Sequence, residues 1–293
     1  MRRFIKRFLG VLFLALVGSG IYAFWCPKNP EIAIEHGARD IFVAENGAVL
    51  GAEDRLPART DGLCPEGRCV LAIHGAMFST REDKFWDPFA TAYPVWRRGL
   101  GDARLVALAW ESGATTWNGW QRAREKGHSS WYGEMLENAS TVAGVLPGLI
   151  GESSGFESAI CHSMGCQILL RGLTDAPDTR IGKVVMLNPA VCPSDPRIDW
   201  AKLENLSVMN IWTPIDKILA AASSDQCANG QPMVGLGGKP ANPPTDWTDI
   251  RYETGIFLKG CRLCLSNPHR YFDHLYSYES DEFWPEISRF LSR

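Results

Sequence analysis

The body of this sequence lacks basic runs and internal repeats. Beyond residue 25, only 26 lysines and arginines stand against 33 aspartates and glutamates, and an acidic body of that kind argues against a nucleic-acid partner. The absence of repeats excludes collagen-like and coiled-coil architectures. Disorder is excluded too, because 45% of the residues are hydrophobic and 22% are charged, as in ordinary globular proteins.

Long hydrophobic runs are also scarce, except for one at the start of the chain. Phe8–Trp25 holds 18 residues without a charge, just enough to cross a bilayer as a helix, and four basic residues precede it. A cleavable signal peptide would use Phe8–Val17, with small residues near the cut but no Ala-x-Ala pattern. An uncut membrane anchor would use the whole run. Both interpretations predict export, to the periplasm or the extracytoplasmic face of the inner membrane.

The nine cysteines agree with export to an oxidising compartment. Cys64-x4-Cys69 and Cys261-x2-Cys264 lie in turn-like stretches, and short disulfides are expected there. Zinc binding is the alternative for such pairs, but one spacing is wrong for a zinc knuckle and no histidine follows at ligand spacing. Cys161 and Cys166 are expected to be small buried apolar residues.

The chain divides into three parts. Residues 1–25 form the signal peptide or anchor, and residues 26–69 form a polar, turn-rich lead-in with one possible hairpin, at Ile41–Leu50 around Asn46-Gly47. In residues 70–293, short apolar runs alternate with longer amphipathic stretches, which predicts a single α/β domain. We expect a mostly parallel central sheet with helices on both faces, preceded by one N-terminal apolar helix.

Five short apolar runs are the candidate strands: Val70–Ile73, Leu105–Trp110, Ser158–Cys161, Lys183–Leu187 and Ser207–Trp212. Three stretches are candidate helices by their apolar spacing. The first carries Trp86, Phe89, Tyr93 and Trp96 on one face, and the second carries Met135, Ala139, Val142 and Leu146. The third begins right after Ser163.

The most specific motif is Ala159-Ile160-Cys161-His162-Ser163-Met164-Gly165-Cys166. An apolar strand runs into His-Ser-Met-Gly, and a helix-like segment follows at once. A serine on such a sharp turn has its hydroxyl exposed above the sheet, at the positive end of the next helix. The turn requires small residues two before and two after the serine, and Cys161 stands where glycine is more usual. The alternative is that Ser163 only caps the helix.

A second motif lies upstream, where the apolar strand Val70–Ile73 ends in His74-Gly75-Ala76-Met77. Together the two motifs resemble the α/β-hydrolase superfamily, and most of all bacterial esterase or lipase-type serine hydrolases. The resemblance covers roughly Val70 to Arg293. It implies that the backbone N–H groups of Met164 and Ala76, rather than Met77, hold the oxyanion of a tetrahedral intermediate. It makes His74 a structural residue of the loop rather than the base.

A serine nucleophile needs a base, which follows it in this fold. His269 and His274 are the histidines downstream of Ser163. The base of the resembling family lies on the loop before the closing helix, and the last amphipathic stretch here is Asp281–Leu291. His274 therefore fits better, whereas His269 follows a proline in a polar loop and is expected to be solvated.

An acid must orient that base. Asp216 follows the strand Ser207–Trp212, at the family's usual position, where its carboxylate can accept the Nδ1–H of His274. The alternatives are Asp195, Asp199 and Asp225, each of which can equally cap a turn. Asp273, adjacent to the base, is expected to point elsewhere.

These residues predict a serine hydrolase that transfers an acyl group to water through Ser163, Asp216 and His274, without a metal or an organic cofactor. The expected substrate is a carboxylic ester, with lipids among the candidates. A thioesterase, an amidase or a peptidase on the same fold remains open, as does a catalytically silent scaffold of the cell envelope. The N-terminal helix, if uncleaved, makes the membrane a partner.

Three regions are candidates for substrate contacts. Trp110, Trp117, Trp120 and Trp131 crowd one stretch and form either an acyl-binding rim or ordinary packing, and packing is favoured. Ala228–Thr248 and Gly255–Leu265 are long connections that fit either a lid or a surface insertion.

Overall fold

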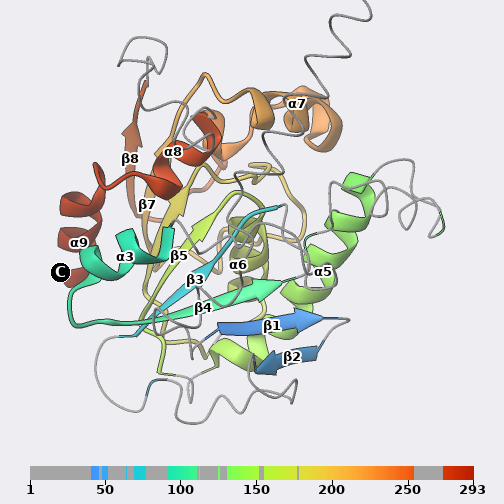
Figure 1. The fold of residues 1–293 in the computed structure, drawn as a ribbon. Helices are drawn as coiled ribbons and strands as arrows, with labels where there is room; N and C mark the ends of the chain where they lie inside the picture. Colours follow the sequence, from blue (N-terminus) through green and yellow to red (C-terminus); the bar gives the residue numbers. More distant parts are fainter. Residues whose placement is uncertain are drawn as a thin grey trace, which may run out of the picture.

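One sheet of eight strands forms the centre of the molecule (Figure 1). The computed structural model describes residues 41–45, 48–51, 64, 69–76, 92–110, 112, 125, 131–151, 155–176, 178–253 and 273–293. Within them the sheet has the order β2-β1-β4-β3-β5-β6-β7-β8, and every neighbouring pair is parallel except β1 with β2. Helices alternate with the strands, so the α/β class predicted from the sequence is confirmed.

Strands and helices alternate from β3 to β6 and from β7 to α8, while β6 is followed by β7 without a helix between them. The strands are β1 (Ile41–Glu45), β2 (Ala48–Gly51), β3 (Cys69–Ile73), β4 (Arg104–Trp110), β5 (Ser158–His162), β6 (Lys183–Leu187), β7 (Ser207–Trp212) and β8 (Asp246–Arg251). The α-helices are α3 (Ala92–Leu100), α5 (Trp131–Ile150), α6 (Met164–Thr174), α7 (Lys217–Gln226), α8 (Asp273–Glu279) and α9 (Trp284–Ser292). Two short 3-10 turns, η2 (Ala228–Gly230) and η3 (Val234–Leu236), follow α7. All five strands and the second and third helices predicted from apolar runs are present.

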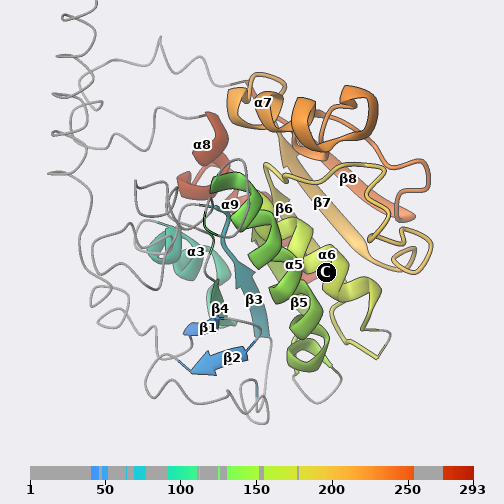
Figure 2. The ribbon, with the colours of Figure 1, turned by 90° about the vertical axis from the view of Figure 1, so that its right-hand side faces the viewer.

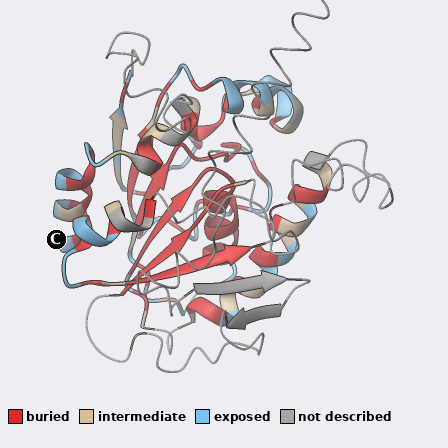
Figure 3. Ribbon diagram, in the orientation of Figure 1, coloured by how far each residue is buried: buried red, intermediate tan, exposed pale blue. Residues whose placement is uncertain are grey.

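Alternate residues of each central strand enter two different cores, because side chains along a strand point to opposite faces of the sheet. In β3, Leu71 and Ile73 belong to one cluster, while Val70 and Ala72 belong to the other. Central strands that are covered on both faces need apolar residues at every position. Figure 3 shows the result, with the central strands buried along their length.

Helices cover both faces of the sheet. One core packs against α5, α6 and α7, and the other against α3, α8 and α9. Figure 2 shows α5 beside α6 in front of the sheet, and the four residues predicted to form the apolar face of α5 are all buried there. Of the first predicted helical face, Trp96 is fully buried in α3, while Trp86 and Phe89 lie outside the described residues.

The predicted hairpin forms and joins the sheet. β1 and β2 pair antiparallel around Asn46-Gly47, and β1 also pairs in parallel with β4. The sheet therefore begins within the segment 26–69. At the other edge, β8 pairs with β7 and starts inside the stretch Ala228–Thr248, which the sequence suggested as a long loop.

Disulfides tie several of these segments to the body. Cys64 pairs with Cys69, as predicted, so this pair is not a zinc site. Cys192 pairs with Cys227, and Met233 and Val234 beyond it are buried. The first half of Ala228–Thr248 is thus anchored to the body at both Cys227 and Met233–Val234. Cys261, Cys264 and the rest of Gly255–Leu265 lie outside the described residues.

The N-terminal segment 1–25 also lies outside the described residues. Among the residues that are described, no helix combines the length and the apolar character needed to cross a membrane.

Candidate active site

Ser163 lies at a tight turn between β5 and α6. Its backbone has φ 52° and ψ −123°, a region that residues other than glycine seldom adopt. Three backbone hydrogen bonds hold it there: its N–H donates to Leu187 at 3.0 Å, and its carbonyl accepts from Cys166 at 3.1 Å and from Ala190 at 3.0 Å. A strained conformation held by so many contacts is typical of functional positions. Its side chain makes no capping bond to α6, which leaves the capping interpretation without support.

Two glycines allow the loop after β3 to approach this turn. A Cβ added at Gly165 would lie 2.4 Å from the carbonyl oxygen of His74, and one added at Gly75 would lie 2.7 Å from the Cβ of Ser163. Both distances are too short for any side chain. A small residue is therefore required two positions after Ser163 because the two backbones are in direct contact there.

Gly165→Ala is expected to destabilise the protein by roughly 3 kcal/mol, because the new methyl group meets rigid carbonyl oxygens. Gly144→Ala in α5 is the matched control. Nothing lies within 4 Å of its added carbon, so that variant should gain about 0.5–1 kcal/mol from helix propensity. Urea unfolding of both variants measures the difference, and equal stabilities would contradict the close packing at Gly165.

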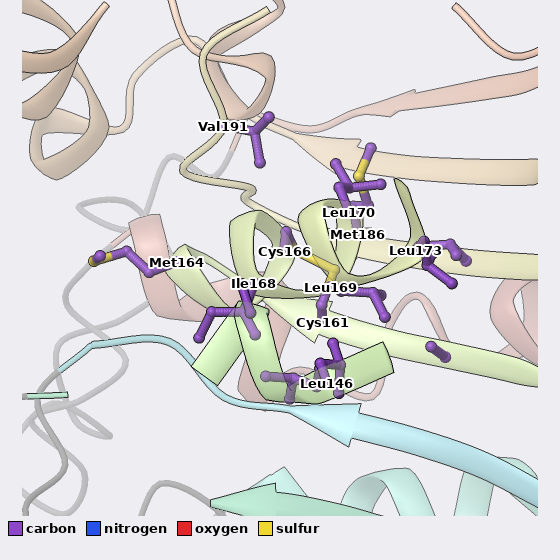
Figure 4. Close-up of a cluster of buried hydrophobic side chains, with 14 of the residues drawn as sticks. Leu146, Cys161, Met164, Cys166, Ile168, Leu169, Leu170, Leu173, Met186 and Val191 are labelled. Carbon is purple, nitrogen blue, oxygen red and sulfur yellow. A yellow bond between two sulfur atoms is a disulfide. The ribbon is translucent and has the colours of Figure 1, made fainter. Parts of the chain in front are cut away.

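Cys161 and Cys166 correct one expectation. Both are fully buried, as predicted, but they are joined by a disulfide that spans the turn on either side of Ser163. Figure 4 shows this bond among the apolar side chains of β5 and α6. The reversal at Ser163 brings the two Cα atoms to 4.9 Å, within the range that a disulfide requires.

The structure brings Ser163, His274 and Asp216 together. The Oγ of Ser163 lies 2.8 Å from Nε2 of His274, and Nδ1 of His274 lies 2.6 Å from Oδ2 of Asp216. All three residues are buried. A carboxylate only accepts, so Nδ1 carries the ring proton and Nε2 is left to accept the proton of the serine hydroxyl.

Each oxygen of Asp216 accepts two hydrogen bonds. Oδ1 accepts from the backbone N–H groups of Ile218 and Leu219, both at 3.0 Å, and so caps α7. Oδ2 accepts from His274 and from the Nδ2 of Asn188 at 3.1 Å. Burial raises the pKa of Asp216, but the charge of His274 and the hydrogen bonds from His274, Leu219 and Asn188 outweigh it and hold the pKa below its ordinary value. The carboxylate is therefore ionised at neutral pH.

The alternative acids have other partners. Asp195 forms a buried ion pair with Arg171 at 2.6 Å, and Asp199 accepts from the backbone of Ala201 in a turn. The side chains of Asp225 and Asp273, and all of His269, lie outside what the structure describes.

Two histidines support the site without touching the serine hydroxyl. Nε2 of His74 accepts from the backbone N–H of Trp110 at 3.0 Å, which gives His74 a structural place in its loop. Trp110 is itself fully buried and stacked on that ring, so it belongs to the core. Nε2 of His162 lies 2.9 Å from the carbonyl oxygen of His274, so it donates that hydrogen bond and carries the proton.

These buried histidines predict a loss of stability in mild acid. Burial lowers the pKa of His74 to about 3 despite two backbone hydrogen bonds, and burial together with the charge of His274 lowers the pKa of His162. Below about pH 6.5 the unfolded chain therefore binds protons that the folded chain does not. Between pH 7 and pH 5, His74 alone should cost about 2 kcal/mol of unfolding free energy, and His162 adds a loss in the same direction. Urea unfolding at both pH values tests this, and equal free energies would contradict it.

The two backbone groups assigned to the oxyanion lie on either side of the serine. Met164 is the first residue of α6, and Ala76 follows Gly75 in the loop that contacts Ser163. In the part of the chain that is described, no backbone hydrogen bond uses the N–H of either residue. Both donors are thus available to a ligand oxygen as far as the described residues are concerned.

Asn188 and His162 are buried contacts of the triad that sequence reasoning missed. The one signal at Asn188 is its residue type, since asparagine tolerates the positive φ of 43° found there. No signal marked His162 beyond its place before Ser163.

A cavity of about 820 Å³ lies at the other end of the strands from Ser163. It is lined by residues near the amino ends of the strands, such as Val70, Ser158 and Lys183, together with parts of α3 and α9. Ser163, Asp216 and His274 do not line it, so this cavity is separate from the cluster that these three residues form. Among the described residues, no three His, Cys, Asp or Glu side chains gather closely enough to hold a metal ion.

Compared with known proteins, the chain matches no family model and no curated protein.

Proposed function

We propose that this protein is a serine hydrolase of the α/β-hydrolase type that cleaves carboxylic esters. The observation that carries the proposal is the continuous hydrogen-bonded series from Ser163 through His274 to Asp216, at 2.8 Å and 2.6 Å. A nucleophile, a base and an orienting acid in this geometry are the parts that acyl transfer needs. The strained turn of Ser163 and the chain order Ser, Asp, His support the same fold type.

The proposed reaction runs in two steps. Oγ of Ser163 attacks the ester carbonyl while Nε2 of His274 takes the hydroxyl proton, and the N–H groups of Met164 and Ala76 stabilise the oxyanion. The C–O bond to the leaving group breaks, and His274 returns the proton to the departing alcohol. Water then attacks the acyl-serine in the same way, giving the carboxylic acid and free Ser163. Asp216 holds the ring and stabilises its positive charge throughout.

The same triad also serves thioesters and amides, because it does not select the leaving group. Esters are proposed because the two sequence motifs resemble esterases and lipases. A catalytically silent scaffold is disfavoured by the intact series of hydrogen bonds, since a scaffold has no chemical need for it. A panel of p-nitrophenyl esters of increasing chain length, beside matched thioesters and anilides, tests the substrate class.

The proposed location is outside the cytoplasm, in the periplasm or on the outer face of the inner membrane. The charge-free run behind four basic residues supports export. The three disulfides among the described residues support an oxidising compartment. If the first helix is retained, membrane-derived acyl lipids are within reach of the site.

A fluorophosphonate probe tests the activated serine directly. The expected result is a single covalent adduct that peptide mapping places on Ser163, because only a hydroxyl whose proton is accepted by His274 attacks phosphorus readily. Acid denaturation before probe addition is the control and should abolish labelling. A folded protein that takes no label, or takes it on another serine, would overturn the proposed function.

A further inference from the structure

Asn188 follows the carboxyl end of β6, just as Ser163 follows the carboxyl end of the neighbouring parallel strand β5. It is fully buried, its backbone has φ 43°, and its N–H donates to the carbonyl of Ile211 at 2.9 Å. A buried amide in a left-handed conformation is costly, so its contacts must compensate for it. The contacts of its side chain are made near the acid Asp216 and the base His274, not at Ser163.

The amide group of Asn188 has only one orientation that satisfies its neighbours. Its Oδ1 accepts from the hydroxyl of Tyr252 at 2.6 Å and from the hydroxyl of Ser277, and its Nδ2 lies 3.1 Å from Oδ2 of Asp216. The reverse orientation would place an amide oxygen against an ionised carboxylate, with no proton between them. The NH₂ group therefore donates to the acid.

These contacts connect the acid to the element that carries the base. Ser277 lies on α8, one turn beyond His274, while Asp216 precedes α7 and Tyr252 follows β8. Asn188 thus contacts both the carboxylate and the helix that must stay aligned with it.

We propose that Asn188 is a positioning residue of the hydrolase: its NH₂ group fixes Oδ2 of Asp216 toward His274, and its carbonyl oxygen ties α8, through Ser277, and the end of β8, through Tyr252, to the same point. This inference rests on the proposed function. When His274 takes the proton of Ser163, the new positive charge must meet an oxygen that is already in place. Oδ1 is held by the backbone of α7, so Asn188 supplies the remaining restraint on Oδ2.

Asn188→Ala tests the proposal, with Asn210→Ala as the matched control. Asn210 is also a buried asparagine that donates to an aspartate, Asp249, at 2.9 Å, but its side chain makes no hydrogen bond to Ser163, Asp216 or His274. Asn188→Ala should lower kcat for a short-chain ester about 100-fold, since small misplacements of a catalytic group have effects of that size, and KM should stay within about twofold. Asn210→Ala should keep kcat near the wild-type value.

A second pair of substitutions removes only the hydroxyls. Tyr252→Phe with Ser277→Ala leaves the carbon packing largely in place but takes away the two donors that hold Oδ1 of Asn188. The double variant should lower kcat about tenfold without a matching rise in KM, because the amide is then less well fixed. It keeps the proposal testable even if Asn188→Ala does not fold.

A readout on the resting protein separates positioning from general stability. The Nδ1 proton of His274 is expected as a downfield NMR resonance in the wild type and in Asn210→Ala, and it should shift or broaden in Asn188→Ala. An unchanged resonance, or a kcat in Asn188→Ala equal to that of Asn210→Ala, overturns the positioning role. If instead wild-type Ser163 takes no fluorophosphonate, the proposed function itself fails, so the two failures are distinguishable.

Discussion

Ser163→Ala is expected to lower kcat for ester hydrolysis by a factor on the order of 10⁴ to 10⁶, because the variant has no atom that can form the acyl intermediate. KM should change little, since the hydroxyl makes no large contribution to binding an ester in its ground state. The fold should persist, because the turn is held by backbone hydrogen bonds and by the Cys161–Cys166 disulfide. Steady-state kinetics with p-nitrophenyl esters measures the effect.

Ser194→Ala is the control for that substitution. Ser194 is exposed and its hydroxyl donates to Gln231, on the surface of the body. Its loss should leave both kcat and thermal stability near the wild-type values. Residual activity of a tenth or more in folded Ser163→Ala would contradict the assignment of the nucleophile.

Asp216→Asn is expected to lower kcat by about 10⁴, through the tautomer of the base rather than through the fold. An asparagine that keeps its oxygen at the Oδ1 position still caps α7, but its NH₂ group then faces Nδ1 of His274. The ring must present an acceptor there and carry its proton on Nε2. In that tautomer His274 cannot accept the proton of Ser163.

Asp249→Asn is the matched control for the acid. Asp249 is also an aspartate whose carboxylate accepts from an asparagine side chain, that of Asn210, but it lies on β8 and outside the triad. Kinetics and circular dichroism on both variants test the prediction. If Asp216→Asn kept most of the wild-type kcat while folded, the acid would have to be another residue.

Much of the fold followed from local patterns in the sequence, whereas Asp216 and His274 followed from the family resemblance that the motif around Ser163 suggested. Central strands such as β6 are apolar at nearly every position, so their bounds could be predicted. β8 was missed because Asp246–Arg251 mixes charged and apolar residues and is only partly buried. An edge strand of that kind has no continuous apolar run to mark it.

The contacts around the triad depend on distances that no local pattern contains. Asn188 meets Tyr252 and Ser277 across 64 and 89 residues, and His162 meets His274 across 112. Cys161 and Cys166 are close in sequence, yet five residues of extended strand would separate them by about 16 Å. Only the reversal at Ser163 brings their Cα atoms to 4.9 Å, and the sequence suggested that turn without showing how tightly it closes.

The spacing of the triad along the chain has a consequence for how activity returns during refolding. His274 lies 111 residues from Ser163 and 58 from Asp216, and β6, β7 and β8 all lie along the chain between Ser163 and His274. Contacts of such long range form slowly, because the entropy of closing long loops is lost before the contact forms. Recovery of ester hydrolysis should therefore lag behind recovery of helical circular dichroism, and it reports the completed sheet rather than a collapsed intermediate.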